Sequence, residues 1–483
     1  MLVTLRDDGP LSHQVYAALR RAILAGELAA GARLPSTRGL ARDLDVSRNT
    51  VLLAYDQLLA EGYIGGRPGS GTYVAETLPD APRPAVGSGT PRTSARPPRL
   101  SAYGRRVVDV RGGTTPRRDG RVPYDFRYGR PTVAEFPHAV WRRLLARHAR
   151  PTAASMSYGP REGTPALREA IAAYLRRVRG VVCDAARVLV VNGSQQALDL
   201  AARVLLDPGD RVVLEEPHYQ GARWAFHAAG ARLVPVPVDG DGLDVARLAR
   251  APRARLAYVT PSHQFPTGVV MSLTRRLALL EWARANDAWV VEDDYDSEYR
   301  YGGRPIEAVQ GLDRAGRVIY AGTLSKVLFP ALRLGYLVLP PALVEPFRAA
   351  KWVTDRHSPT LEQEVLAEFI AEGHFERHLR RARTRHAARR AALLAALASH
   401  LGDRVEVVGA NAGVHVLVWL RDVSARALPA VIAAAGRSGV GVYSIAPYFF
   451  RPPRRAGLIL GYAPLTERQI REGIARLARV LAR

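Results

Sequence analysis

Residues 317–340 read RVIYAGTLSKVLFPALRLGYLVLP and place two apolar runs, rich in β-branched residues, on either side of a short turn. Comparable runs, separated by helical stretches, lie at 187–191, 211–217, 255–261 and 288–295. Continuous apolar strands that alternate with helices are typical of a parallel sheet covered on both faces. We therefore predict that residues 124–483 form a large α/β domain, with a mostly parallel central sheet and a small C-terminal α+β subdomain.

Lys326 directly follows the first of these two runs. It is one of only two lysines, with Lys351, among 69 basic residues. Lysine, unlike arginine, can lose its proton and act as an amine nucleophile. Its position after a strand favours a Schiff base with a carbonyl cofactor, whose phosphate Arg333 could bind. An ordinary surface lysine and arginine are the alternative that this stretch leaves open.

A second strand, in AWVVEDDYDSEY (288–299), ends in acidic residues. Asp293 and Tyr295 lie two residues apart, so in a strand they point to the same face. A buried carboxylate keeps a pyridine nitrogen protonated, and a phenol can hydrogen-bond the 3′-oxygen of such a ring. Asp294 leaves the register of the acids open. A divalent metal is the alternative, but no nearby histidine or nucleotide motif supports it, and we predict no metal site.

Two further strand ends carry polar turns. VVNGSQQALDLAARVL (190–205) reads as a strand, a turn and a helix, so the amides of Gly193, Ser194 and Gln195 would face an anion. EEPHYQG (215–221) offers Tyr219, which could lie over a cofactor ring or simply belong to the core. Ligands bind at the carboxyl ends of strands in α/β sheets. These groups are therefore predicted to form one site.

The N-terminal region predicts a winged helix-turn-helix over residues 1–75. Residues 11–62 read as three helices, of which the second and third begin after Ser36 and Ser47, both plausible N-caps. The sequence that follows, YIGGRPGSGTYVA (63–75), predicts a hairpin with a glycine-rich tip. The predicted buried positions of the first and third helices are Val15, Leu19, Ala22, Ile23, Val51, Tyr55, Leu58 and Leu59.

The formal net charge of +24 favours a polyanionic partner. Residues 1–75 nevertheless hold eight basic and seven acidic side chains, so the motif rather than the charge indicates DNA binding. Residues 76–123, rich in Pro, Arg, Gly and Ser, predict a flexible linker. The single cysteine, Cys183, allows no internal disulfide. The sequence holds no apolar run of membrane-spanning length and no secretory signal, so a cytoplasmic protein is expected.

Taken together, these motifs resemble the MocR/PdxR family of bacterial regulators, in which a GntR-type winged helix is joined to a domain similar to fold-type I aminotransferases. LPSTRGLARDLDVSRNTVLLAYDQLLAEGY (34–63) and GSGTYV (69–74) carry the GntR resemblance. The second half of the resemblance rests on TPSHQFPTG (260–268), EDDYDSEY (292–299), GTLSK (322–326), LRLGY (332–336) and EGHFERHLRRAR (372–383).

The resemblance implies pyridoxal 5′-phosphate as the cofactor, bound covalently by Lys326. It places Asp293 at the pyridine nitrogen, Tyr295 at the 3′-oxygen and Tyr219 on the ring. It also implies a homodimer, domain-swapped head to tail, in which Tyr158 reaches the phosphate of the neighbouring subunit. The phosphate contacts that it implies within one subunit come from Gly193, Ser194, Gln195, Thr323, Ser325 and Arg333.

Two positions depart from the aminotransferase pattern. Phe265 stands where aminotransferases usually carry an asparagine to the 3′-oxygen, and Ile459 stands where they place the arginine that binds a substrate α-carboxylate. Without that bidentate contact an amino acid is poorly oriented. The sequence therefore favours a PdxR-like regulator that senses pyridoxal phosphate and controls vitamin B6 synthesis, with no catalytic residue assigned. The alternatives are a regulator responding to an amino compound (γ-aminobutyrate, taurine or an ectoine derivative) and an active aminotransferase.

Operator DNA is the expected partner of the N-terminal domain. The first turn of a recognition helix faces base edges in the major groove. The predicted DNA contacts are Arg38, Arg48, Asn49, Thr50 and, on the wing, Arg67 and Ser70. The arginine-rich stretch 377–390 offers a second DNA contact, although a solvated or dimer-facing helix, paired with Glu372 and Glu376, is favoured.

Overall fold

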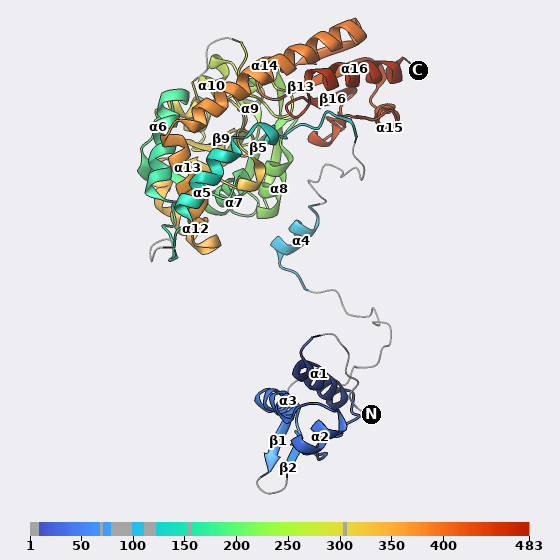
Figure 1. The fold of residues 1–483 in the computed structure, drawn as a ribbon. Coiled ribbons are helices and arrows are strands. Elements are labelled where there is room, and N and C mark those ends of the chain that lie inside the picture. The colour runs from blue at the N-terminus through green and yellow to red at the C-terminus, as the bar shows by residue number, and fades with distance from the viewer. Residues whose placement is uncertain are drawn as a thin grey trace. The chain divides into compact units, whose positions relative to one another are not determined.

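The computed structural model describes residues 9–67, 71–78, 99–110, 122–151, 156–302 and 307–482. The chain divides into two compact units, Met1–Arg99 and Leu100–Arg483, each of which is described by itself (Figure 1). Among the helices of the described residues, none combines the length and apolar character needed to cross a membrane.

The smaller unit is a three-helix domain with a two-stranded wing, as predicted. Its elements are α1 (Leu11–Leu24), α2 (Thr37–Asp43), α3 (Arg48–Ala60), β1 (Ile64–Arg67) and β2 (Gly71–Val74). Both predicted N-caps are confirmed: the Ser36 hydroxyl accepts from the Gly39 amide at 3.0 Å, and the Ser47 hydroxyl accepts from the Thr50 amide at 3.1 Å. These bonds pair amides that a helix start leaves free.

The core of this unit joins α1 to α3. All four predicted α1 positions are buried. On α3 the buried residues are Val51, Ala54, Tyr55 and Leu58. The prediction of Leu59 was wrong, because its side chain is 52% exposed. A residue eight positions after Val51 has turned about 80° away from it at 3.6 residues per turn, whereas Leu58, at seven, stays on the buried face.

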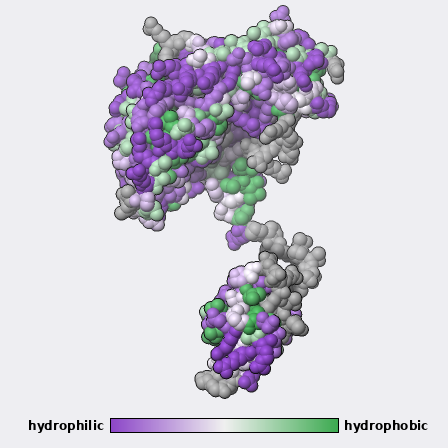
Figure 2. Space-filling view, viewed as in Figure 1, coloured by the Kyte–Doolittle hydropathy of each residue, from purple (hydrophilic) through white to green (hydrophobic). Residues whose placement is uncertain are grey.

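The predicted linker 76–123 contains a helix, α4 (Ala102–Val108), which corrects the expectation of a wholly flexible segment. It packs on α8 (Gln220–Ala229) of the larger unit. Arg106 Nε donates to the Ala228 carbonyl at 2.9 Å, so a cation lies at the C-terminal end of α8, where the helix dipole favours it. Val107 and Val108 stay exposed, in an apolar patch that Figure 2 shows over α4. The sequence did not reveal this helix, because seven residues are too few to show the repeat of apolar positions that is typical of a helix.

An eight-stranded sheet forms the centre of the larger unit, in the order β4-β11-β10-β9-β8-β5-β6-β7. Strands β5, β6, β8, β9 and β10 are mutually parallel, and β11 runs antiparallel to both β10 and β4, which confirms a mostly parallel sheet. The bounds are β4 (Val188–Val191), β5 (Arg211–Glu216), β6 (Arg232–Asp239), β7 (Gly242–Leu243), β8 (Leu256–Val259), β9 (Trp289–Asp294), β10 (Val318–Thr323) and β11 (Gly335–Val338).

Helices cover both faces of this sheet, because successive residues of each strand point to opposite sides. One face packs on α7 (Ser194–Leu205), α8 and α12 (Val344–Asp355). The other packs on α5 (His138–His148), α6 (Pro165–Arg179), α9 (Val245–Arg250), α10 (Leu273–Ala285), α11 (Val309–Leu312) and α13 (Thr360–Ala371).

The predicted C-terminal α+β subdomain is confirmed. Its four-stranded sheet has the order β12-β13-β16-β15, and the 28-residue helix α14 (His374–Leu401) extends into it from the α/β region (Figure 1). A short pair, β3 (Tyr124–Asp125) with β14 (Val440–Gly441), joins the start of the described α/β region to it. The remaining elements are β12 (Val405–Val408), β13 (His415–Ser424), α15 (Leu428–Arg437), β15 (Tyr443–Ser444), β16 (Arg455–Gly461) and α16 (Glu467–Leu481).

Leu58 and Leu59 provide a matched pair for testing the α3 packing. Leu58→Ala should lower the free energy of unfolding of the smaller unit by about 2–5 kcal/mol, because it leaves a cavity in the core. Leu59→Ala should change it by less than about 1 kcal/mol, because that side chain is half exposed. Hydrogen exchange of the α1 and α3 amides in the full chain measures both. Equal losses of protection would contradict this packing.

Candidate functional site

The carboxyl ends of β4, β5, β8, β9 and β10 meet at one edge of the central sheet, where a cavity of about 640 Å³ opens. The structure brings nine of the eleven predicted cofactor residues into its wall: Ser194, Gln195, Tyr219, Asp293, Tyr295, Thr323, Ser325, Lys326 and Arg333. Gly193 adjoins this set, and Tyr158 does not belong to it.

Lys326 lies in the turn after β10 and faces the cavity. Its Nζ donates to the Gly129 carbonyl at 3.0 Å. Burial lowers the pKa of the Lys326 amine, and the carboxylates of Asp296 and Asp293 oppose that shift. A lowered pKa increases the fraction of neutral amine, which is the nucleophilic form.

Asp293 and Asp296 line the cavity and Asp294 does not, so the geometry separates Asp293 from Asp294. Asp293 Oδ2 accepts from the Tyr258 hydroxyl at 2.8 Å, while its buried Oδ1 has no hydrogen-bond partner among the described residues. Burial raises the pKa of Asp293 to about 6. Asp294 instead accepts from Arg179 at 2.9 Å and from the Tyr320 hydroxyl at 2.6 Å. The free Oδ1 suits a protonated nitrogen.

An anion cradle lies at the start of α7. Ser194 and Gln195 carry first-turn amides, and this helix has no side-chain cap. Arg333 donates from Nη2 to the Asn192 carbonyl at 2.7 Å. A Cβ at Gly193 would lie 2.9 Å from that nitrogen, so glycine, at φ 80°, is what allows the arginine this close. Free amides and a guanidinium together fit a phosphate.

Aromatic side chains form the opposite wall. Tyr219 precedes α8, and its ring meets the Phe265 ring edge-on, with centroids 5.8 Å apart. Burial raises the pKa of Tyr219 to about 12, so its phenol is neutral. Phe265 also meets the Tyr295 ring edge-on at 6.0 Å. A flat heteroaromatic ring fits between such walls.

Tyr158 lies away from the cavity and is 78% exposed. Its ring packs edge-on against His357, with centroids 6.0 Å apart, and under the guanidinium of Arg356. The predicted contact with the phosphate of a neighbouring subunit therefore stays a prediction.

The position of the missing carboxylate-binding arginine is apolar. Ile459 on β16 is completely buried and packs with Leu417, Ile445 and Tyr448. Two other arginines do line the cavity, Arg127 and Arg130. Sequence reasoning missed them because they follow the very short strand β3.

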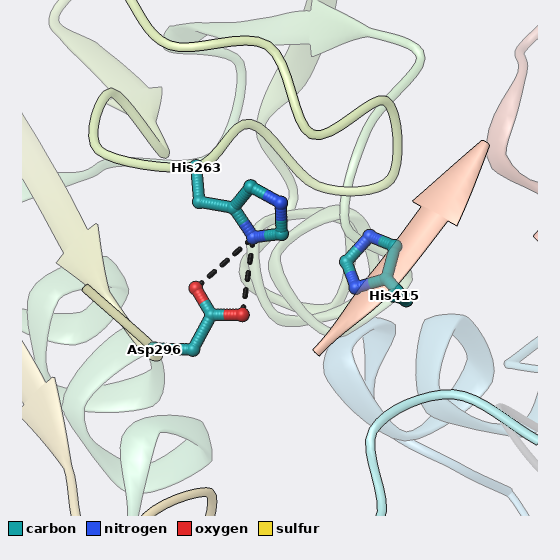
Figure 3. A group of neighbouring side chains, drawn as sticks. All are labelled: His263, Asp296 and His415. Carbon is teal, nitrogen blue, oxygen red and sulfur yellow. Dashed lines mark hydrogen bonds and ion pairs between the residues drawn. The ribbon is translucent and has the colours of Figure 1, made fainter. Parts of the chain in front are cut away.

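Sequence reasoning also missed the polar groups next to the Tyr295 hydroxyl. His263 and Asp296 lie side by side, completely buried, with His415 next to them (Figure 3). No histidine lies near the acids in the sequence, whereas the fold brings two, His263 and His415, close to Asp296. Asp296 sits in the quoted acidic motif and His263 in TPSHQFPTG, so the signal was present. His415 comes from β13, and only the tertiary fold reveals it.

In the smaller unit, three of the predicted DNA contacts, Arg48, Asn49 and Thr50, form the first turn of α3, and Arg38 lies on α2. Arg38, Arg48 and Asn49 are exposed, while Thr50 is half-buried and its hydroxyl lies 2.8 Å from that of Ser47. Arg67 ends β1 in the wing. Ser70 lies outside the described residues.

The arginine-rich part of α14 is engaged in contacts within the chain. Arg385 and Arg389 pair with Glu135 at 2.9 and 2.5 Å, and Arg383 donates to the Glu298 carbonyl at 3.0 Å. Of the predicted glutamate partners, Glu376 pairs with Arg177 instead. These contacts favour the structural interpretation of this helix over a second DNA contact.

Two family models match the chain. "Bacterial regulatory proteins, gntR family" covers residues 11–74, and "Aminotransferase class I and II" covers residues 129–477. The chain is 45% identical over 482 residues to the probable rhizopine catabolism regulatory protein MocR of Rhizobium meliloti, across 99% of this chain and 95% of that protein. It is 32% identical to the pyridoxine biosynthesis regulator PdxR of Corynebacterium glutamicum, across 74% of this chain and 73% of that protein.

Among solved structures, a kynurenine aminotransferase of Pyrococcus horikoshii in complex with PMP matches with a TM-score of 0.69 and 31% identity, across 75% of this chain and 91% of that one. The chain therefore belongs to the MocR/PdxR family: it is a transcriptional regulator in which a GntR-type helix-turn-helix domain is joined to an aminotransferase-like domain.

Proposed function

We propose that this regulator binds pyridoxal 5′-phosphate in the cavity of its larger unit and uses the occupied site as a sensor. The observation that carries the proposal is the unpartnered Oδ1 of Asp293, buried opposite Lys326. Lys326 would hold the aldehyde carbon, Asp293 the ring nitrogen and Arg333 the phosphate. When bound, the cofactor supplies an electron-withdrawing ring and a carbonyl that amines can attack.

Ile459 supports sensing rather than turnover. An aminotransferase needs its substrate oriented over the cofactor, and a bidentate carboxylate contact supplies much of that orientation. Ile459 offers no charge and is packed among apolar side chains. We therefore favour pyridoxal phosphate itself as the signal and genes of vitamin B6 synthesis as the target, as the name of the PdxR relative suggests.

A regulator of amine catabolism is the second candidate. The relative at 45% identity is named for rhizopine catabolism. Arg127 and Arg130 line the cavity and could bind a ligand's anionic group. In this case an amino compound would react with the bound cofactor and change the response.

We propose that helix α8 transmits the state of the cavity to the linker that leads to the DNA-binding unit. Its first residues, Gln220 and Gly221, line the cavity, and its last turn holds Arg106 of the linker. Val110, just after α4, also lines the cavity. We propose a homodimer in the cytoplasm, in which Tyr158 completes the neighbouring site and two winged helices contact two half-sites on DNA.

The cofactor assignment predicts a yellow protein with an absorption band at about 420 nm, a property of the cofactor's own chemistry. Lys326→Ala and Lys326→Arg should both abolish the band while far-UV circular dichroism stays unchanged. Lys351, which is buried and paired with Asp355 at 2.6 Å, is the other lysine. A band that survives both Lys326 variants, or is lost only when Lys351 is replaced, would overturn the assignment.

Arg48, exposed in the first turn of α3, is predicted to contact a base edge. Arg48→Ala should weaken binding to the cognate operator by about 1–3 kcal/mol and binding to random DNA by much less. Fluorescence anisotropy with both fragments at one salt concentration measures the difference. Equal losses on both DNAs would make Arg48 a phosphate contact instead.

Sensing requires that the cofactor-loaded and cofactor-free forms differ on DNA. A ligand shifts an equilibrium only through a difference in its affinity for the two states, and the coupling is reciprocal. Loaded and unloaded protein should therefore differ in operator affinity or in DNA bending. Anisotropy and gel mobility on one operator fragment test this, with the Lys326→Ala protein as the matched unloaded control. Identical affinity and identical bending would refute the sensor function.

A further inference from the structure

The Tyr295 hydroxyl contacts one member of a buried pair of side chains, His263 and Asp296, of which Asp296 also lines the cavity. The hydroxyl oxygen lies 3.0 Å from Nδ1 of His263. The same nitrogen lies 3.1 and 3.0 Å from the two carboxylate oxygens of Asp296 (Figure 3). His263 and Asp296 are each 1% exposed, so water does not compete for these contacts.

The chemistry of the pair fixes the direction of the Tyr295 hydrogen bond. An ionised carboxylate only accepts, so the Asp296 oxygens require a proton on Nδ1 of His263. That nitrogen then has no lone pair to accept from the phenol. The Tyr295 oxygen must accept a share of the Nδ1 proton, and the phenol's own proton is left to point elsewhere, toward the cavity that Tyr295 lines.

The other neighbours cannot fix the phenol in this way. Phe265 meets the Tyr295 ring edge-on and has no polar atom. His415, whose ring centroid is 4.8 Å from that of His263, has its Nε2 3.2 Å from the Pro266 carbonyl instead. The charged groups that line the same cavity as Tyr295 are Lys326, Asp293, Asp296 and three arginines, Arg127, Arg130 and Arg333.

We propose that His263 and Asp296 are positioning residues that hold Tyr295 as a hydrogen-bond donor toward the cavity. Phe265 stands where aminotransferases usually carry an asparagine, so no side-chain amide at that position can donate to the 3′-oxygen. In this chain the pair compensates for that missing amide by orienting Tyr295. The inference rests on the proposed function, since the acceptor would be the 3′-oxygen of the bound cofactor. This role gives a reason for a buried carboxylate and a buried imidazole next to the Tyr295 hydroxyl.

The proposal is tested by measuring how the absorption band at about 420 nm changes with pH in the cofactor-loaded full-length protein. A hydrogen bond donated to the 3′-oxygen reduces the negative charge on that oxygen, a charge that helps the bound cofactor to retain its nearby proton. Loss of the donor should therefore move the pH at which the band is half converted to a higher value. Tyr295→Phe should raise it by about one pH unit, the size of one charge-assisted hydrogen bond. Asp296→Asn also removes a charge, so its effect must be measured with and without Tyr295.

The decisive quantity is the coupling between the two positions. The shift caused by Asp296→Asn should be about one pH unit more positive in the Tyr295 protein than in the Tyr295→Phe protein. Equal shifts in both backgrounds would overturn the proposal, because a purely electrostatic or structural role does not depend on the phenol. His263→Gln provides a second test of the same coupling should Asp296→Asn fold poorly.

Asp125→Asn is the matched control. Asp125 accepts from the Tyr443 hydroxyl at 2.6 Å and pairs with Arg127, a set of contacts that includes neither His263 nor Tyr295, so its coupling to Tyr295→Phe should be zero. A wild-type protein with no band at all contradicts the proposed cofactor. A wild-type band that titrates with no coupling contradicts only the role of His263 and Asp296.

Discussion

Three buried carboxylates at the end of β9, those of Asp293, Asp294 and Asp296, constrain the whole site. An unpaired anion in the interior costs several kcal/mol, so each needs a partner or must change its protonation. Arg179 and the Tyr320 hydroxyl both bind Oδ2 of Asp294, whose Oδ1 has no hydrogen-bond partner among the described residues but does not line the cavity, and His263 satisfies Asp296. Asp293 has the Tyr258 hydroxyl on one oxygen and nothing on the other among the described residues. The site is incomplete at this atom, next to Lys326.

Local patterns allowed most of the fold to be predicted. The helix caps at Ser36 and Ser47 depend on residues three positions away, and the central strands are continuous apolar runs. Strand β6 was not singled out because Pro235 and Pro237 interrupt it. Pro235 and Pro237 lie two residues apart, so the N–H groups that they lack would both point to the same edge of β6. On that edge β7 pairs only with Val238 and Asp239, so neither proline removes a ladder hydrogen bond.

The candidate site was predictable wherever its residues end a strand. Parallel strands bring their carboxyl ends to one edge, so Asp293, Lys326 and Tyr219 could be placed together from sequence alone. Contacts made across the fold could not be found in this way. The Gly129 carbonyl that accepts from Lys326 lies 197 positions away in the sequence, and His415 belongs to the C-terminal subdomain. No sequence period links such residues.

The loss of the carboxylate-binding arginine is built into the packing rather than confined to one side chain. Ile459 is enclosed by Leu417, Ile445 and Tyr448, so a guanidinium there would be buried without a partner. Restoring it would require repacking this apolar cluster as well. Arg127, which follows β3, is held instead by the hydroxyl of Tyr443 at 3.0 Å, and Tyr443 is the strand partner of Ile459. A ligand anion bound by Arg127 would therefore meet a guanidinium from the segment after β3 rather than one on β16, which separates recognition of a ligand from the carboxylate contact that turnover requires.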